Sequence, residues 1–174
     1  MVERWRIVIG SDGDGLAYKD ALKADMKADS RVARVIDVGA RAGKRTPYQS
    51  VAVAAARELM EGRADRALLI CGSGLGVAMS VNKLPGIRAV TATDSSSVER
   101  SVVDNDAQVL CFGHLVIGIE MARRLAGEWL DYRFADGAAN NVTAITAYRE
   151  NADSRQGPPS LVSHGELHES SIAQ

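Results

Sequence analysis

The residues best suited to chemistry lie in one glycine-rich stretch, Leu68–Asn82, which reads LLICGSGLGVAMSVN. Its apolar start predicts a buried strand and its end predicts a helix, with a cysteine and three glycines at the corner between them. Glycine lets the backbone approach a ligand closely, and the first amides of a helix favour an anion. The corner could therefore hold a phosphate, or an oxyanion that forms during a reaction.

Cys71, at the end of the predicted strand, is the candidate catalytic group. A thiol beside the amino terminus of a helix ionises more readily than a free thiol. The thiolate can abstract a proton while nearby amides stabilise the resulting enediolate. The competing interpretation is that Cys71 is a small buried apolar residue, as most free cysteines are. Spacing alone leaves both interpretations open.

Other common site types fit the sequence poorly. The glycine spacing differs from the G-x-G-x-x-G of dinucleotide-binding loops, and it follows the third predicted strand rather than the first. Ser11–Gly15 reads SDGDG, but Lys23 stands where a calcium loop needs a bidentate glutamate. We expect a strand-to-helix corner there, with Asp14 capping the helix. His114 is the one histidine outside the polar C-terminal stretch, which argues against a histidine-based metal site.

These residues must be positioned by apolar β-rich runs that alternate with segments of helical spacing. The strands are predicted at Trp5–Gly10, Arg34–Val38, Ala67–Cys71, Ile87–Ala92 and Gln108–Phe112. The helices are predicted at Leu16–Ala28, Tyr48–Glu61, Gly76–Leu84, Ser96–Asp104, Val116–Leu130 and Val142–Glu150, with inward faces from Leu22, Met26, Val51, Ala55, Leu59, Met121 and Leu125. This order predicts a three-layer, Rossmann-like α/β fold: a five-stranded parallel sheet with helices on both faces. Ligands bind such sheets at the carboxyl ends of the strands.

The composition predicts one globular domain over residues 1–151 and a flexible, polar tail over 152–174. The helix at 142–151 would pack poorly alone, so we expect it to dock on a second subunit. The net charge is −1 with dispersed basic residues, which argues against nucleic acid or a membrane as partner. No apolar run approaches the roughly 18 residues of a membrane span, and the charged amino terminus is unlike a secretory signal. We therefore expect a cytoplasmic protein in which Cys71 and Cys111 form no disulfide.

Residues Ile70–Val90 read ICGSGLGVAMSVNKLPGIRAV, which closely resembles the motif of the type B ribose-5-phosphate isomerases. That family includes galactose-6-phosphate isomerase subunits and tetrose-phosphate isomerases. The resemblance extends from Ile7 to about Tyr148 and includes the IGSD string that ends at Asp12, together with DNDAQ at Asp104–Gln108. It implies metal-independent enzymes without a cofactor. It also implies homodimers with active sites shared between subunits, and leaves open whether the dimers pair into tetramers.

The resemblance also implies roles for individual residues. Cys71 matches the base that moves a proton between C1 and C2, and Ser73 matches the hydroxyl that assists proton movement on the substrate oxygens. The matching oxyanion amides and substrate contacts are those of Gly72, Gly74, Gly76, Asp12, Tyr48 and Asn105. Asp12 is the third catalytic candidate beside Cys71 and Ser73. His114 is a further binding candidate because of its corner position, against the alternative of an ordinary, partly buried histidine.

The sequence departs from the family where charge would be needed. The family's ring-opening histidine corresponds to Asp104, an arginine after the fifth strand corresponds to Leu115, and phosphate-binding arginines lie further along the chain. The arginines near the carboxyl terminus fall around Gly137 and Asn141. Arginine binds phosphate through bidentate, charge-assisted hydrogen bonds that these residues cannot make. Phosphate would have to be held by backbone amides together with side chains drawn from His114, Lys44, Arg45 and Arg88.

The missing histidine bears on the substrate. A tetrose phosphorylated on its terminal oxygen cannot close the usual furanose ring, so it needs no group to open one. The first expectation is an isomerase of ribose 5-phosphate and ribulose 5-phosphate that works through an enediolate. The alternatives are a tetrose 4-phosphate (erythrose/erythrulose) isomerase and a catalytically impaired homologue that binds sugar phosphates.

Overall fold

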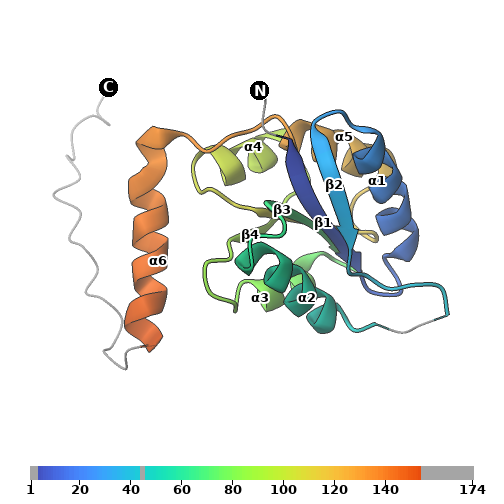
Figure 1. Ribbon diagram of the computed structural model, residues 1–174, viewed down its shortest axis with the longest axis horizontal. Coiled ribbons are helices and arrows are strands. Elements are labelled where there is room, and N and C mark those ends of the chain that lie inside the picture. The colour runs from blue at the N-terminus through green and yellow to red at the C-terminus, as the bar shows by residue number, and fades with distance from the viewer. Residues whose placement is uncertain (1–3, 44–45, 154–174) are drawn as a thin grey trace, which may run out of the picture.

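Figure 1 shows the computed structural model, which describes residues 4–43 and 46–153. The strands are β1 (Trp5–Ser11), β2 (Val32–Asp37), β3 (Arg66–Cys71), β4 (Ala89–Thr91) and β5 (Val109–Gly113). The helices are α1 (Leu16–Ala28), α2 (Tyr48–Met60), α3 (Leu75–Val81), α4 (Ser95–Val103), α5 (Ile119–Trp129) and α6 (Ala139–Asp153), with a 3₁₀ turn, η1 (Asp136–Ala138). The strands form one parallel sheet in the order β2-β1-β3-β5-β4. The predicted α/β fold is confirmed.

Two apolar layers hold helices against the faces of the sheet. On one face, α1, α4 and α5 pack on side chains of β1, β3 and β5. On the other face, α2 and α3 pack on the alternate side chains of the same strands. Every residue of the central strand β3 is buried. A strand covered on both faces is apolar along most of its length, which explains the run ALLIC at Ala67–Cys71 that follows Arg66.

The apolar stripe of α5 differs from the prediction. Met121, expected to face the core, is 42% exposed. The buried positions are instead Ala122, Leu125, Ala126 and Trp129. Their spacing of three, four and seven residues forms one face of a helix that begins at Ile119. Met121 lies beside that face. The sequence-based prediction chose it over the neighbouring Ala122 because methionine has the larger apolar side chain.

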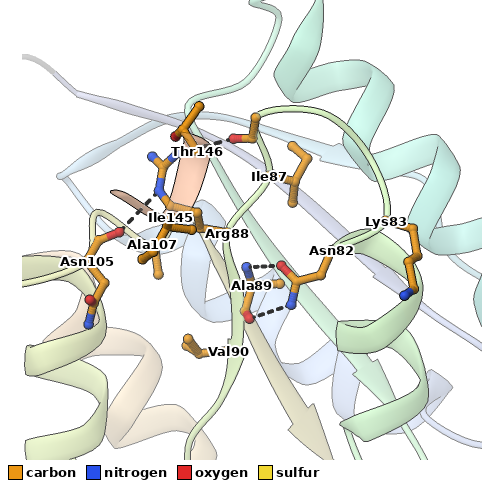
Figure 2. Close-up of a pocket in the computed structure, with 11 residues that line it drawn as sticks. Asn82, Lys83, Ile87, Arg88, Ala89, Val90, Asn105, Ala107, Ile145 and Thr146 are labelled. Carbon is orange, nitrogen blue, oxygen red and sulfur yellow. Dashed lines mark hydrogen bonds between the residues drawn. The ribbon is translucent and has the colours of Figure 1, made fainter. Parts of the chain in front are cut away.

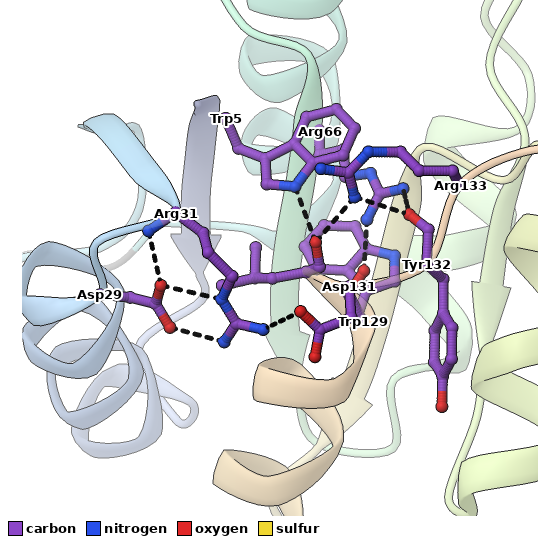
Figure 3. A network of polar contacts seen from close by, with 9 residues as sticks. Trp5, Asp29, Arg31, Arg66, Trp129, Asp131, Tyr132 and Arg133 are labelled. Carbon is purple, nitrogen blue, oxygen red and sulfur yellow. Dashed lines mark hydrogen bonds and ion pairs between the residues drawn. The ribbon is translucent and has the colours of Figure 1, made fainter. Parts of the chain in front are cut away.

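At the amino-terminal edge of the sheet, two tryptophans enclose the buried Arg66 (Figure 3). The guanidinium of Arg66 lies 4.0 Å from the ring centre of Trp5 and 5.0 Å from that of Trp129. It donates hydrogen bonds to the backbone oxygens of Trp129 and Tyr132. Burial lowers the pKa of Arg66 to about 10. This cluster fixes the segment after α5 and so determines where the chain departs towards α6.

Helix α6 stands away from the sheet and its covering helices (Figure 1). It begins three residues before the predicted start at Val142, and the side chain of Asn141 donates to the backbone oxygen of Asp104 at 3.2 Å. The tail expected over 152–174 lies almost wholly outside the described residues, as do Lys44 and Arg45. Within the described part of the chain, no helix is both long and apolar enough to cross a membrane.

Candidate active site

The glycine-rich corner lies where the connections of the sheet change direction. The chain leaves β1 towards β2 on one side and later returns to form β3 on the other side of β1. Ser11, at the end of β1, is in register with Ile70, and Cys71, at the end of β3, is in register with Gly113. The corners after β1, β3 and β5 therefore meet at the carboxyl edge of the sheet, where α/β proteins bind their ligands.

The Cys71 sulfur lies inside the turn that follows β3. It is 3% exposed and accepts a hydrogen bond from the backbone amide of Gly74 at 3.2 Å. Gly74 has a φ of +80°, and a Cβ there would lie 2.9 Å from the backbone carbon of Phe112. Glycine at this position therefore allows the turn to fold over the sulfur. The Gly74 amide therefore holds the sulfur in a fixed position beside the start of α3.

Ser73 lies in the turn after β3, and Tyr48 packs against the helix that follows it. Ser73 is exposed, and its Oγ accepts a hydrogen bond from the amide of Leu75 at 3.3 Å. A Cβ on Gly76 would lie 2.9 Å from the ring of Tyr48, so the phenol of α2 rests directly against the first turn of α3. The structure thus brings Tyr48 to the glycine loop, Gly72–Gly76, although at least 23 residues lie between them in the sequence.

Asp12 lies beside the glycine loop, at the corner after β1. Its backbone amide donates to the oxygen of Ile70 at 3.4 Å, which ties the corner to the end of β3. Its Oδ1 accepts a hydrogen bond from the amide of Gly15 at 2.9 Å, just before α1 begins at Leu16. The predicted cap from Asp14 is wrong: Asp14 is exposed, and Asp12 makes the side-chain contact that closes this turn.

His114 follows β5 at the third corner. Its amide donates to the oxygen of Cys71, and the amide of Leu115 donates to the oxygen of Gly72, both at 3.1 Å. The imidazole packs edge-on against Tyr18 with ring centres 6.0 Å apart. Its Nε2 is buried and has no hydrogen-bond partner among the described residues. The Leu115 side chain is 79% exposed and leans towards Gly72.

Asn105 is the predicted site residue that does not join the others within one chain. It lies between the end of α4 and the start of β5, at the amino-terminal edge of the sheet, whereas Cys71 lies at the carboxyl edge. Asn105 lines a pocket of about 810 Å³ between the 82–90 segment and α6, and Figure 2 shows its position among the lining residues. Arg88, a candidate phosphate ligand, is also engaged there: it donates to the oxygens of Asn105 and Asp106 and pairs with the Asp106 carboxylate.

A buried charged cluster beside the β1 corner was not predicted from the sequence. Lys19 has a side chain only 2% exposed, and its Nζ donates to Asp37 at 3.0 Å and to the oxygen of Ala40 at 2.7 Å. Lys23 pairs with the same carboxylate at 2.6 Å. Burial would raise the pKa of Asp37, but Lys23, the Gly39 amide and Lys19 together hold it below its usual value.

The second cysteine and the acidic residues form no competing site. Cys111 lies within β5, fully buried, and burial raises the pKa of its thiol. Both cysteines are free. Among the described residues, no cluster of three or more histidine, cysteine or carboxylate side chains could hold a metal ion. The chemistry available at the carboxyl edge is that of a thiol, an aliphatic hydroxyl, a carboxylate, an imidazole, a phenol and backbone amides.

Comparison with known proteins identifies the family of the chain. Residues 7–145 match the model of a family described as Ribose/Galactose Isomerase. The chain is 55% identical to D-erythrulose-4-phosphate isomerase 2 of Mycolicibacterium smegmatis over 146 residues, which cover 82% of this chain and 96% of that protein. It is 35% identical to ribose-5-phosphate isomerase B of Escherichia coli over 146 residues, 83% and 97% of the two chains. The type B ribose 5-phosphate isomerase of Leishmania infantum superposes with a TM-score of 0.82 at 26% identity, covering 86% of this chain and 99% of that one. The chain belongs to the ribose/galactose isomerase family.

Proposed function

We propose that this aldose–ketose isomerase acts in the cytoplasm on a four-carbon sugar phosphate, interconverting D-erythrulose 4-phosphate and D-erythrose 4-phosphate. The observation that carries the proposal is the Cys71 sulfur, held by the Gly74 amide at the carboxyl end of the central strand. The 55% identity to a D-erythrulose-4-phosphate isomerase supports the choice of substrate over the five-carbon sugar that the sequence analysis placed first.

The reaction needs one base that serves two neighbouring carbons. The Cys71 thiolate removes a proton from C1 of the ketose, and the electrons of the C–H bond move to the C2 oxygen, giving an enediolate. The thiol then returns the proton to C2 as the C1 oxygen becomes the aldehyde. C1 is oxidised and C2 is reduced, so no cofactor is required. Amides of the glycine loop stabilise the negative charge, and the exposed Ser73 hydroxyl can exchange protons with the two oxygens.

Four carbons fit the residues that the site lacks. A tetrose 4-phosphate stays open-chain, so it needs no ring-opening group. Asp104, which replaces the family's ring-opening histidine, pairs with Arg100 at 3.5 Å. Leu115, in place of an arginine, presents an apolar surface beside Gly72. We assign phosphate binding to backbone amides of the carboxyl edge, assisted by His114. Lys44 and Arg45, two further candidates from the sequence, lie outside the described residues.

The substrate assignment is tested by measuring kcat/KM for both directions of the erythrose/erythrulose and ribose/ribulose pairs. A difference of one carbon unit in a fitted pocket changes kcat/KM by about 10-fold or more, so a site shaped for four carbons should favour the four-carbon pair by at least that factor. Ribose 5-phosphate is the second candidate because of the 35% identity to ribose-5-phosphate isomerase B. A preference for the five-carbon pair would select it. Activity on neither pair would favour a protein that only binds sugar phosphates.

The position of Asn105 favours an active site completed by a second copy of the chain. Asn105 and Cys71 lie at opposite edges of the sheet, so in this proposal the Asn105 of one subunit contacts substrate held by Cys71 of the other. Helix α6 supports it, because it stands apart and leaves Ile145 47% exposed beside the pocket (Figures 1 and 2). We propose a homodimer in which α6 packs on the partner.

Mixing two inactive variants tests the shared site. Cys71→Ala and Asn105→Ala should each have little activity alone. A mixed dimer contains one site with both native residues, so equal mixing after dissociation should recover about a quarter of the wild-type activity. Mixing Cys71→Ala with Ser73→Ala is the negative control: both residues lie on one loop, so neither site of the mixed dimer is native at both positions, and the mixture should be no more active than Ser73→Ala alone. In a mixture shown to contain mixed dimers, recovery no greater than in this control would show that Asn105 acts elsewhere.

A further inference from the structure

We propose that Lys19 is a positioning residue, which clamps the Ser11–Asp12 corner in the place where Asp12 meets the substrate. Lys19 lies in the first turn of α1, and its ammonium group is buried against Asp37 and the backbone oxygen of Ala40. The inference rests on the proposed function, in which Asp12 contacts the sugar phosphate.

The clamp reaches Asp12 through the segment that follows β2. Lys19 holds the oxygen of Ala40, and the amide of Ala40 donates to the oxygen of Ser11 at 2.7 Å. Between them, Gly39 packs so closely that a Cβ there would lie 2.7 Å from the Lys19 side chain and 2.5 Å from the Ser11 amide. A displacement of the ammonium group therefore passes through two hydrogen bonds and a backbone contact to the residue directly before Asp12.

Neutralising Asp37 does not require a buried lysine. Lys23 already pairs with the Asp37 carboxylate at 2.6 Å, and its side chain is 26% exposed, so its charge is far less desolvated than that of Lys19. Removing a charge from water costs several kcal/mol, and an apolar side chain often serves stability equally well at such a place. What Lys19 alone provides is the bond to Ala40, which fixes the backbone beside the active-site corner.

The matched pair Lys19→Met and Lys23→Met separates the two contributions. Each variant removes one ammonium group from Asp37, but only Lys19→Met releases Ala40. A shift of the corner by a fraction of an ångström should lower kcat/KM about 10-fold or more in Lys19→Met, while Lys23→Met stays within about twofold of the wild type. Equal activities for the two variants would overturn the inference.

A double-mutant cycle distinguishes positioning from a general loss of stability. If Lys19 acts through Asp12, Lys19→Met should have almost no further effect on kcat/KM in an Asp12→Ala background. It should keep its full effect in a Ser73→Ala background, because Ser73 lies on a different corner. An undiminished effect in the Asp12→Ala background would refute the inference.

If Lys19→Met does not fold, Gly39→Ala replaces it, since its methyl group enters the same contact. It must show the same coupling to Asp12, and independence from Asp12 would refute the inference. The proposed function fails separately: a wild-type enzyme that isomerises neither the four-carbon nor the five-carbon pair would contradict it whatever Lys19 does.

Discussion

Replacing Gly113 by alanine should disturb the site without removing any of its functional groups. Gly113 ends β5 opposite Cys71, and a Cβ there would lie 2.4 Å from the backbone carbon of Ser73 and 2.5 Å from its oxygen. Ordinary contacts begin near 3.4 Å, so the Ser73 backbone must retreat by about 1 Å. Because the obstacle is backbone and not a flexible side chain, the whole glycine loop has to move.

The size of that movement sets the expected loss. A displacement of about 1 Å in a group that acts on the reacting atoms costs about 100-fold in rate, or about 2.7 kcal/mol in the activation barrier. Overpacking should also lower the free energy of unfolding by about 1–3 kcal/mol. The catalytic loss should appear mainly in kcat, because Ser73 and the amide that holds the Cys71 sulfur both shift relative to the substrate carbons.

The assay compares Gly113→Ala with Gly127→Ala, the same substitution at a helical glycine with open space around it. Gly127→Ala should retain the wild-type kcat. Its free energy of unfolding should rise by about 0.5–1 kcal/mol, because alanine has a higher helix propensity than glycine. Urea unfolding measures stability, and turnover of erythrulose 4-phosphate measures activity. A folded Gly113→Ala enzyme with kcat within twofold of the wild type would refute the close coupling of Gly113 to the loop.

Three further predictions concern other parts of the molecule. Iodoacetate should alkylate Cys71 well before Cys111, because burial raises the pKa of the Cys111 thiol. Inorganic phosphate should slow the alkylation of Cys71. Equal alkylation rates of the two cysteines, measured by mass spectrometry, would contradict this prediction. Arg66→Ala should lower the free energy of unfolding by about 3 kcal/mol: about 1 kcal/mol for each of two hydrogen bonds to carbonyl oxygens and about 1 kcal/mol for stacking on tryptophan. A loss of less than about 1 kcal/mol, measured by urea unfolding, would argue against this. The lowered pKa of Asp37 contributes stability that is complete above the pKa of the unfolded chain, about 3.8, and is lost as the pH falls through the pKa of the folded protein. Asp37→Asn should therefore flatten the decline of Tm in acid. An unchanged decline would count against the ion pairs.

The sequence predicts the sheet well because each strand and helix has a clear local signal. Leu16–Ala28 is predicted to the residue, since a helical apolar pattern lies between a glycine corner and a polar turn. The strand expected at Ile87–Ala92 is shorter, at Ala89–Thr91. Side chains take the backbone groups at its amino-terminal end: the amide of Arg88 bonds to Gln108, and both backbone groups of Ala89 bond to Asn82 (Figure 2). Side-chain pairing of this kind leaves no periodic signal.

The candidate site is predicted in part for a similar reason. Cys71, Ser73 and the glycines are contiguous in the chain, and Asp12 follows a strand, so topology alone brings them together. Lys19 could not be found this way, because a lysine in an amphipathic helix normally reads as a solvated residue, and its burial depends on the end of β2. The meeting of Tyr48 with Gly76 also depends on tertiary packing.

The most direct test of the account is the activity of Cys71→Ala on erythrulose 4-phosphate, measured in D₂O with Cys111→Ala as the matched control. If Cys71 is the base, the wild type and Cys111→Ala should incorporate solvent deuterium at C2 of the erythrose 4-phosphate formed. Cys71→Ala should lose about 10²-fold or more in turnover together with the exchange, while remaining folded. Retention of more than about a tenth of the activity would mean that less than about 1.4 kcal/mol of the barrier depends on that thiol, which would contradict its role as the base.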